Sequence, residues 1–231
     1  MLLDRERKSL ELIGGLAGIL AGIILIFAYG LLTVGYPPQT CCTEEFFRQL
    51  PQFKTAAVIS SMLIPSAWVL GMPLFIALYA DLKETSKRYA LLGTVAGLIG
   101  AGVASITLFE GTLNWLGLSE LYETTPDSAK NVVVAAAETM EMAGASLLGP
   151  ILILLIIAFV AIGMAMLRAG AFRRASGWAS IILGGLLLAS LPLSGVLMFL
   201  HWWMPVLFAF IVIPTIVWLL YMGFQVYRLS R

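Results

Sequence analysis

Residues 12–34 read LIGGLAGILAGIILIFAYGLLTV, a run of 23 residues without a charge. A helix needs about 20 apolar residues, each rising 1.5 Å, to cross the roughly 30 Å hydrocarbon core of a membrane. The run is too long for the apolar part of a cleaved signal peptide, which has about 7–15 residues, and no A-x-A cleavage site follows it. We therefore expect a retained first transmembrane helix.

Five further stretches have the same length and apolar character. The expected spans are residues 12–34, 56–80, 89–110, 142–167, 178–200 and 203–226. They predict an all-α polytopic membrane protein, in which residues 1–231 form one domain, a bundle of six transmembrane helices. The composition agrees, because only 12% of the residues are charged, against about 25% in a soluble domain. It argues against a cytosolic enzyme, a nucleic-acid-binding module and a disordered chain.

The charged residues lie near the ends of these spans and are divided unequally between the two sides. Six spans place both termini on one side, which holds 11 of the 14 Lys and Arg residues. Because basic residues favour the cytoplasmic side of a membrane, we expect both termini in the cytoplasm. The expected inner side has eleven basic and five acidic residues, which give it a net charge of +6. The expected outer side has three basic and eight acidic residues, which give it a net charge of −5. The total charge of +1 hides this dipole.

The second outer segment contains a candidate helix start. Thr125 is suited to cap a helix whose first residue is Pro126. A helix from residue 126 to 167 is about 63 Å long, twice the thickness of the membrane core. We expect it to project outward, with a bend near Pro150 as the alternative.

Small residues at a spacing of four mark surfaces through which membrane helices approach closely. The first span carries Gly14, Gly18 and Gly22, and the third carries Gly93 and Gly97. Two interpretations of these helix-packing glycines stay open. Either they pack the helices of one chain together, or they dock another subunit or a second copy.

Four residues near the outer ends of the spans form a candidate cation site. Glu138 and Glu141 lie three positions apart on one helical face, and Glu110 ends the third span. The only histidine, His201, lies between the last two spans and is a candidate fourth ligand. Carboxylate and imidazole groups are common metal ligands. The alternative interpretation is that these residues are solvated helix ends.

Cys41 and Cys42 are adjacent in the first outer segment, on the expected oxidising side of the membrane. They allow a strained disulfide between neighbours, a bridge to another chain or two free thiols. The sequence has no C-x-x-C motif and no glycine-rich nucleotide-binding motif. It predicts no cofactor, no nucleotide and no nucleic-acid partner, and it does not favour an enzyme.

Two stretches on the inner side resemble an uncharacterised family of six-helix prokaryotic membrane proteins. One is LYADLK at residues 78–83 with RYALLG at residues 88–93, and the other is RAGAFRRASGW at residues 168–178. The second is similar to the R-S-G-x-L-P-R-x-L-G loop of that family, with Ala169 in place of Ser and Arg173 in place of Pro. The resemblance implies a six-span protein of the prokaryotic inner membrane and implies no activity.

Two functions fit these patterns. The first is a non-catalytic accessory or scaffold subunit, which docks other membrane subunits or itself through its glycine-rich faces or outer segments. The second is a small transporter, channel or lipid-handling protein with an acidic outer vestibule. No Lys, Arg, Asp or His lies centrally in a span. Because such residues normally form proton relays, a proton-coupled pump is not expected.

Overall fold

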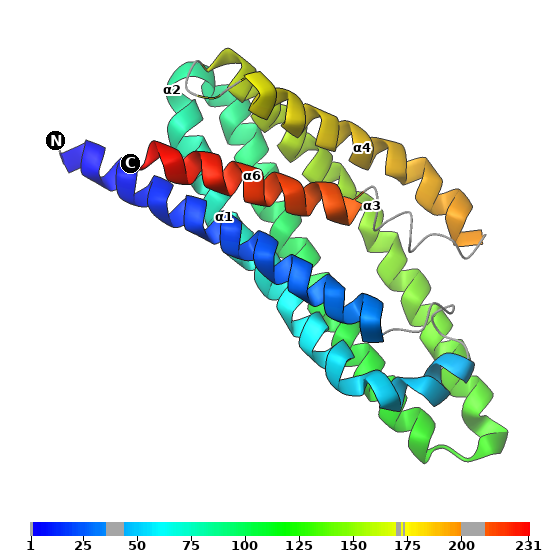
Figure 1. Cartoon of the computed structure of the whole chain (residues 1–231). Helices are drawn as coiled ribbons and strands as arrows, with labels where there is room; N and C mark the ends of the chain where they lie inside the picture. Colours follow the sequence, from blue (N-terminus) through cyan, green and yellow to red (C-terminus); the bar gives the residue numbers. More distant parts are fainter. Residues whose placement is uncertain (1, 36–43, 170–171, 173, 200–210) are drawn as a thin grey trace.

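The structure, a computed structural model, describes residues 2–35, 44–169, 172, 174–199 and 211–231. These residues confirm the all-helical class and contain no strand. The helices are α1 (Leu2–Gly35), α2 (Glu44–Thr124), the 3₁₀ helix η1 (Asp127–Ala129), α3 (Lys130–Arg168), α4 (Arg174–Phe199) and α6 (Ile213–Leu229) (Figure 1). Among the described residues, α1, α2, α3 and α4 each contain a segment long and apolar enough to cross a membrane. The number of crossings stays a prediction.

The long helix α2 folds back on itself at Ser86. The backbone angles of this residue, φ −149° and ψ 52°, lie outside the helical region. The kink separates limbs of residues 44–85 and 87–124, which run antiparallel (Figure 1). Hydroxyl groups of the second limb tie it to the first: Thr94 donates to the Phe75 carbonyl at 3.2 Å, and Ser105 to the Pro65 carbonyl at 3.2 Å. The two limbs cover the predicted spans 56–80 and 89–110.

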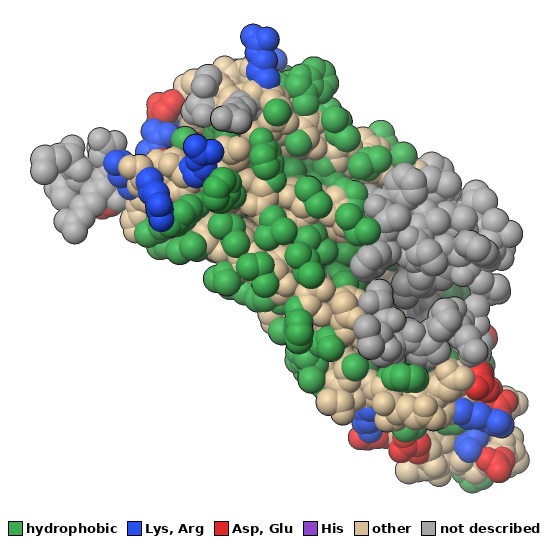
Figure 2. Space-filling model, viewed as in Figure 1, with side chains coloured by type: hydrophobic (Ala, Val, Ile, Leu, Met, Phe, Trp, Pro, Cys, Tyr) green, Lys and Arg blue, Asp and Glu red, His purple; other side chains and the backbone are tan. Residues whose placement is uncertain are grey.

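Both chain ends lie at the same end of the molecule as the Ser86 kink, and we call it the inner end (Figure 1). Two contacts join other helices to α2 near the Ser86 kink. Arg7 near the start of α1 bonds Asp81, and the guanidinium of Arg168, at the end of α3, lies 4.4 Å from the centre of the Tyr89 ring. Basic side chains gather at this end, acidic and basic ones at the opposite or outer end, and apolar ones between them (Figure 2). An apolar band between two charged ends suits a protein that crosses a membrane.

Three aromatic rings in the core of the bundle, those of Phe75, Phe159 and Trp218, contact one another. The Trp218 ring stacks on Phe75, with centroids 5.8 Å apart, and meets the edge of Phe159 at 4.7 Å. The indole N–H of Trp218 donates to the Ser180 hydroxyl at 2.7 Å. Around these rings α1 packs mainly against α2 and α6, and α3 packs against α2 and α4. Trp218 thus links α6 to α2, α3 and α4.

Two helices are longer than the spans predicted within them. The second limb of α2 continues past residue 110 to Thr124, and α3 begins at Lys130 rather than near 142 and runs through Pro150. Each is about 57 Å long, against a membrane core of about 30 Å. They form a hairpin that extends toward the outer end (Figure 1).

The predicted helix start at Thr125 is wrong. The Thr125 hydroxyl donates backward to the Leu121 carbonyl at 2.6 Å, so it does not cap the helix that follows. The chain instead enters η1, for which Pro126 is the N-cap residue, before α3 begins. The backward bond satisfies a carbonyl in the last turn of α2, and that competing local partner explains the difference.

Candidate functional site

The outer end of the hairpin holds a separate small core, which we call the tip cluster. It combines the first turns of α2, the last turns of α2 and the start of α3, and it consists of Phe46, Phe47, Leu50, Trp115, Leu118, Tyr122, Val133, Val134 and Ala137. The Phe47 and Tyr122 rings stack with centroids 5.0 Å apart, and Phe46 meets Trp115 edge-on at 5.3 Å. This aromatic packing fixes the three segments relative to one another.

Ion pairs surround the tip cluster. Each basic residue of the outer end pairs with an acid: Arg48 with Glu44 at 2.6 Å, Lys54 with Glu120 at 3.9 Å and Lys130 with Asp127 at 2.8 Å. The Lys130 ammonium also lies 4.9 Å from the centre of the Tyr122 ring. The hydrogen bond to the Lys130 ammonium lowers the pKa of Asp127, which lies outside the predicted spans. The outer end has more acidic than basic residues, so it keeps a net negative charge after these three pairs are counted.

Large apolar side chains stay exposed beside the tip cluster. Leu121 is 51% exposed and Val132 is 66% exposed. Along the helix axis Leu121 lies about 51 Å from Lys87, and Val132 lies about 54 Å from Arg168. If both helices ran perpendicular to the membrane, with the basic inner residues at one surface, both side chains would lie about 20 Å beyond the other edge of the hydrocarbon core. Apolar groups at that height face water unless another protein covers them.

The inner end contains a cluster of three charged residues, in which the two acids are buried. Arg7 donates to Glu11 Oε1 at 3.0 Å and to Asp81 Oδ1 at 3.0 Å. The side chain of Glu11 is 6% exposed and that of Asp81 is fully buried, whereas that of Arg7 is 46% exposed. Oδ2 of Asp81 is buried and has no hydrogen-bond partner. Two carboxyl groups therefore share one guanidinium group.

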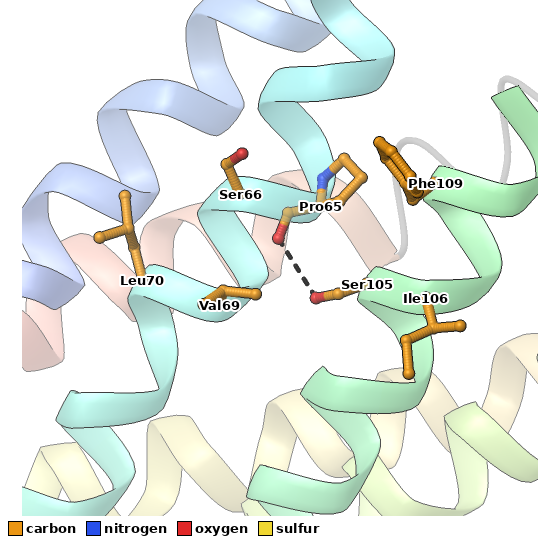
Figure 3. Close-up of a pocket in the computed structure, with 7 residues that line it drawn as sticks. All are labelled: Pro65, Ser66, Val69, Leu70, Ser105, Ile106 and Phe109. Atoms are coloured by element: carbon orange, nitrogen blue, oxygen red, sulfur yellow. Dashed lines mark hydrogen bonds between the residues drawn. The ribbon is translucent and has the colours of Figure 1, made fainter. Parts of the chain in front are cut away.

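An apolar groove lies between the two limbs of α2. Its volume is about 470 Å³, and it is lined by Pro65, Ser66, Val69, Leu70, Ser105, Ile106 and Phe109 (Figure 3). The Ser105 hydroxyl is bonded to the Pro65 carbonyl, so little polar surface is left free. The side chains of Val69 and Ile106 at its edge are exposed on the apolar surface. The groove suits an apolar chain rather than a polar ligand.

The structure describes only part of the predicted cation site. Glu110 and Glu138 are exposed on α2 and α3. Position 141 lies one turn beyond Glu138 on α3, whereas His201, like Cys41 and Cys42, lies outside the described residues. Within the described part of the chain no three His, Cys, Asp or Glu residues come together as metal ligands. The cation site stays a prediction.

The five predicted packing glycines lie where helices of the same chain cross. A Cβ atom at any of them would come within 3.0 Å of an atom of another helix or of the other limb of α2. Their neighbours are Pro73 for Gly14, Leu74 for Gly18, Leu220 for Gly22, Ile162 for Gly93 and Phe75 for Gly97. These glycine faces are therefore covered within the chain.

Glu11 and Asp81 were expected among the loop charges of the inner end, but both side chains are buried. A signal was present: Glu11 lies three positions before Gly14 and seven before Gly18, on the same face of α1. A face that packs closely on α2 also buries the acid one turn earlier. The partner Arg7 lies one further turn back, at the spacing typical of helical ion pairs.

Comparison of the chain with models of protein families, with curated proteins and with solved structures gave no match. The resemblance of the two inner loops to a six-helix family stays a prediction.

Proposed function

We propose that this chain is a non-catalytic accessory subunit of the prokaryotic inner membrane, with six spans and both termini in the cytoplasm, and that it docks a partner through the outer end of its hairpin. The exposure of Leu121 and Val132 beyond the membrane carries the proposal. Single exposed apolar residues are ordinary. Here, however, two of them flank a rigid aromatic core about 20 Å above the hydrocarbon, where no lipid covers them.

The outer end is favoured over the glycine faces as the docking surface. The glycine faces contact α2, α3 and α6 of the chain itself, so a partner would have to displace them. The tip cluster, by contrast, is held together by its own aromatic contacts and needs no rearrangement to receive a partner.

The charge of the outer end indicates the partner's chemistry. Its three basic residues are already paired with acids, while Glu110, Glu123 and Glu138 are exposed. Two copies of such a surface repel each other. The partner is therefore another membrane subunit that presents basic residues around an apolar patch on its outer side.

Photo-cross-linking in native membranes tests this docking. A photoreactive residue at position 121 or 132 should give an adduct with one and the same protein, and the yield should fall as ionic strength rises because charge attraction brings the surfaces together. The matched control is position 217, since Val217 is equally exposed, at 58%, but lies within an expected span. It should give lipid adducts. Three outcomes would contradict the proposal. Positions 121 and 132 could give only lipid adducts, they could cross-link two copies of this chain, or the yield of the protein adduct could stay the same as the ionic strength rises.

The groove between the limbs of α2 favours a second function, the handling of a lipid or a similar apolar molecule. Its volume of about 470 Å³ lies in the range of small-molecule sites. The same experiment separates the two functions. A photoreactive residue at position 106, on the edge of the groove, should then capture one lipid class selectively, while positions 121 and 132 give no protein adduct.

A further inference from the structure

The cluster of Arg7, Glu11 and Asp81 at the inner end has an unbalanced charge. If both carboxyl groups were ionised, the cluster would hold two negative charges against one positive charge. Both acids are buried, and burial of an uncompensated charge is strongly unfavourable. A bound positive charge would restore the balance.

The unpartnered oxygen of Asp81 shows where that charge belongs. The Arg7 guanidinium binds Oδ1 of Asp81, with Nη2 at 3.0 Å and Nε at 3.2 Å. Oδ2 is buried and receives no hydrogen bond. The carboxyl group of Glu11, which shares the Arg7 guanidinium, acts on Asp81 as a like charge. Since carboxylate oxygens only accept hydrogen bonds, a proton on one of the two carboxyl groups that share Arg7 removes one of the two buried negative charges.

We propose that Glu11 and Asp81 together bind one proton, so that a carboxylic acid and a carboxylate, paired with Arg7, join α1 to the first limb of α2. The site is a proton-binding site of the inner end and is independent of the proposed docking at the outer end. Arg7 is half-exposed, so the site lies next to water on the inner side.

Among the side chains that the structure describes at the inner end, no further basic group is bonded to this cluster. Within α1 and α2, Lys8, Lys83, Lys87 and Arg88 are exposed. Arg228 of α6 and Arg231, which follows this helix, lie over aromatic rings of α6. Arg168 of α3 lies over the Tyr89 ring. The groups that act on the Asp81 carboxyl are Glu11, which opposes its ionisation, and Arg7, which favours it.

The electrostatic environment agrees with the geometry. Asp81 and Glu11 lie immediately outside the predicted spans 56–80 and 12–34. Burial, followed by the neighbouring Glu11, raises the pKa of Asp81 from its ordinary 3.8 to about 7, although Arg7 acts in the opposite direction. Because the pKa is higher in the folded state than in the unfolded chain, the folded state binds this proton more tightly. The stabilisation of the folded state by this bound proton is complete below about pH 4 and is lost as the pH rises through about 7.

Infrared spectroscopy of the purified protein, recorded as the pH is raised, tests the proposal. The wild type should show the C=O stretching band of one protonated carboxylic acid, which disappears near neutral pH. Asp81→Asn and Glu11→Gln should each remove this band, because a single carboxylate beside Arg7 and an amide has no need of the proton. The exposed Glu6, on the same helix, provides the control: Glu6→Gln should keep the band. A wild type without the band would overturn the proposal, whatever the variants do.

Unfolding measured over the same pH series gives a second test. Asp81→Asn imitates the protonated carboxyl in shape and charge, so its unfolding midpoint should lose the fall that the wild type shows between about pH 4 and 7. If Asp81 were an ordinary ionised partner of Arg7, Asp81→Asn would instead be destabilised throughout, and most at neutral pH. A midpoint that depends on the sodium concentration at constant pH would also overturn the proposal, since a metal cation would then occupy the place of the proton.

Discussion

Replacing Trp218 with Ala is expected to lower the free energy of unfolding by about 3–5 kcal/mol, the usual range for removing a large aromatic side chain from a packed interior. Trp218 is only 3% exposed, and its ring contacts Phe75 of α2 and Phe159 of α3. Removing it opens a cavity where α6 meets these helices. Titration of the detergent-solubilised protein with sodium dodecyl sulfate, followed by loss of helix packing, measures the effect.

Two variants separate packing from hydrogen bonding at this position. Trp218→Phe keeps most of the ring contacts and loses the bond to Ser180, whose hydroxyl still donates to the Ser176 carbonyl at 3.1 Å. Its cost should be about 1 kcal/mol. Val217→Ala, one position away on the apolar surface, should have almost no effect, because lipid replaces the lost contacts. Equal losses for Val217→Ala and Trp218→Ala would show that α6 does not present Trp218 to the core.

Replacing Gly15 with Ala is expected to destabilise the protein by about 1–3 kcal/mol, the typical cost of overpacking. A Cβ atom at position 15 would lie 2.5 Å from the backbone nitrogen of Tyr227 and 2.8 Å from the carbonyl oxygen of Gly223. Backbone atoms cannot turn aside as the end of a side chain can. The methyl group must therefore push α1 and α6 apart.

Gly111 provides a control with the opposite expected sign. It lies inside α2, and nothing comes within 4 Å of a Cβ placed there. Because Ala favours a helix more than Gly does, Gly111→Ala should stabilise the protein by up to about 1 kcal/mol. The same titration compares both variants. If Gly15→Ala proved as stable as Gly111→Ala, α1 and α6 would not cross at Gly15.

The apolar runs and the small-residue spacings in the sequence predicted much of the helical core. The apolar runs predicted the all-helical class, because hydropathy is a pattern local to one helix. The five predicted glycines lie at contacts within the chain, and the number of spans stays a prediction. Gly15 and Gly223 escaped prediction since each lies outside a spacing of four, and their contact joins helices about 200 positions apart. A crossing between distant segments leaves no local pattern.

The candidate sites were harder to predict, for two physical reasons. Hydropathy marks the part of a helix that lies in lipid, so it ended the predicted spans near residues 110 and 142, although both helices continue outward as a hairpin. Asp81 is buried and bonded to Arg7, which lies 74 positions earlier in the chain, and no local pattern in the sequence links these two residues. Residue type and position relative to the spans predicted a side of the membrane for Asp81 but did not identify its neighbours.

The central claim is that the basic end faces the cytoplasm and the hairpin projects from the other side. Reaction of single cysteines with a membrane-impermeant thiol reagent tests it most directly, in a variant whose Cys41 and Cys42 are replaced by Ser. In intact cells Gly117→Cys and Asp127→Cys should react, and Val103→Cys, within the span, should not. Lys87→Cys should react only after the cells are permeabilised. Reaction of Lys87→Cys in intact cells, or protection of Gly117→Cys and Asp127→Cys, would contradict the account.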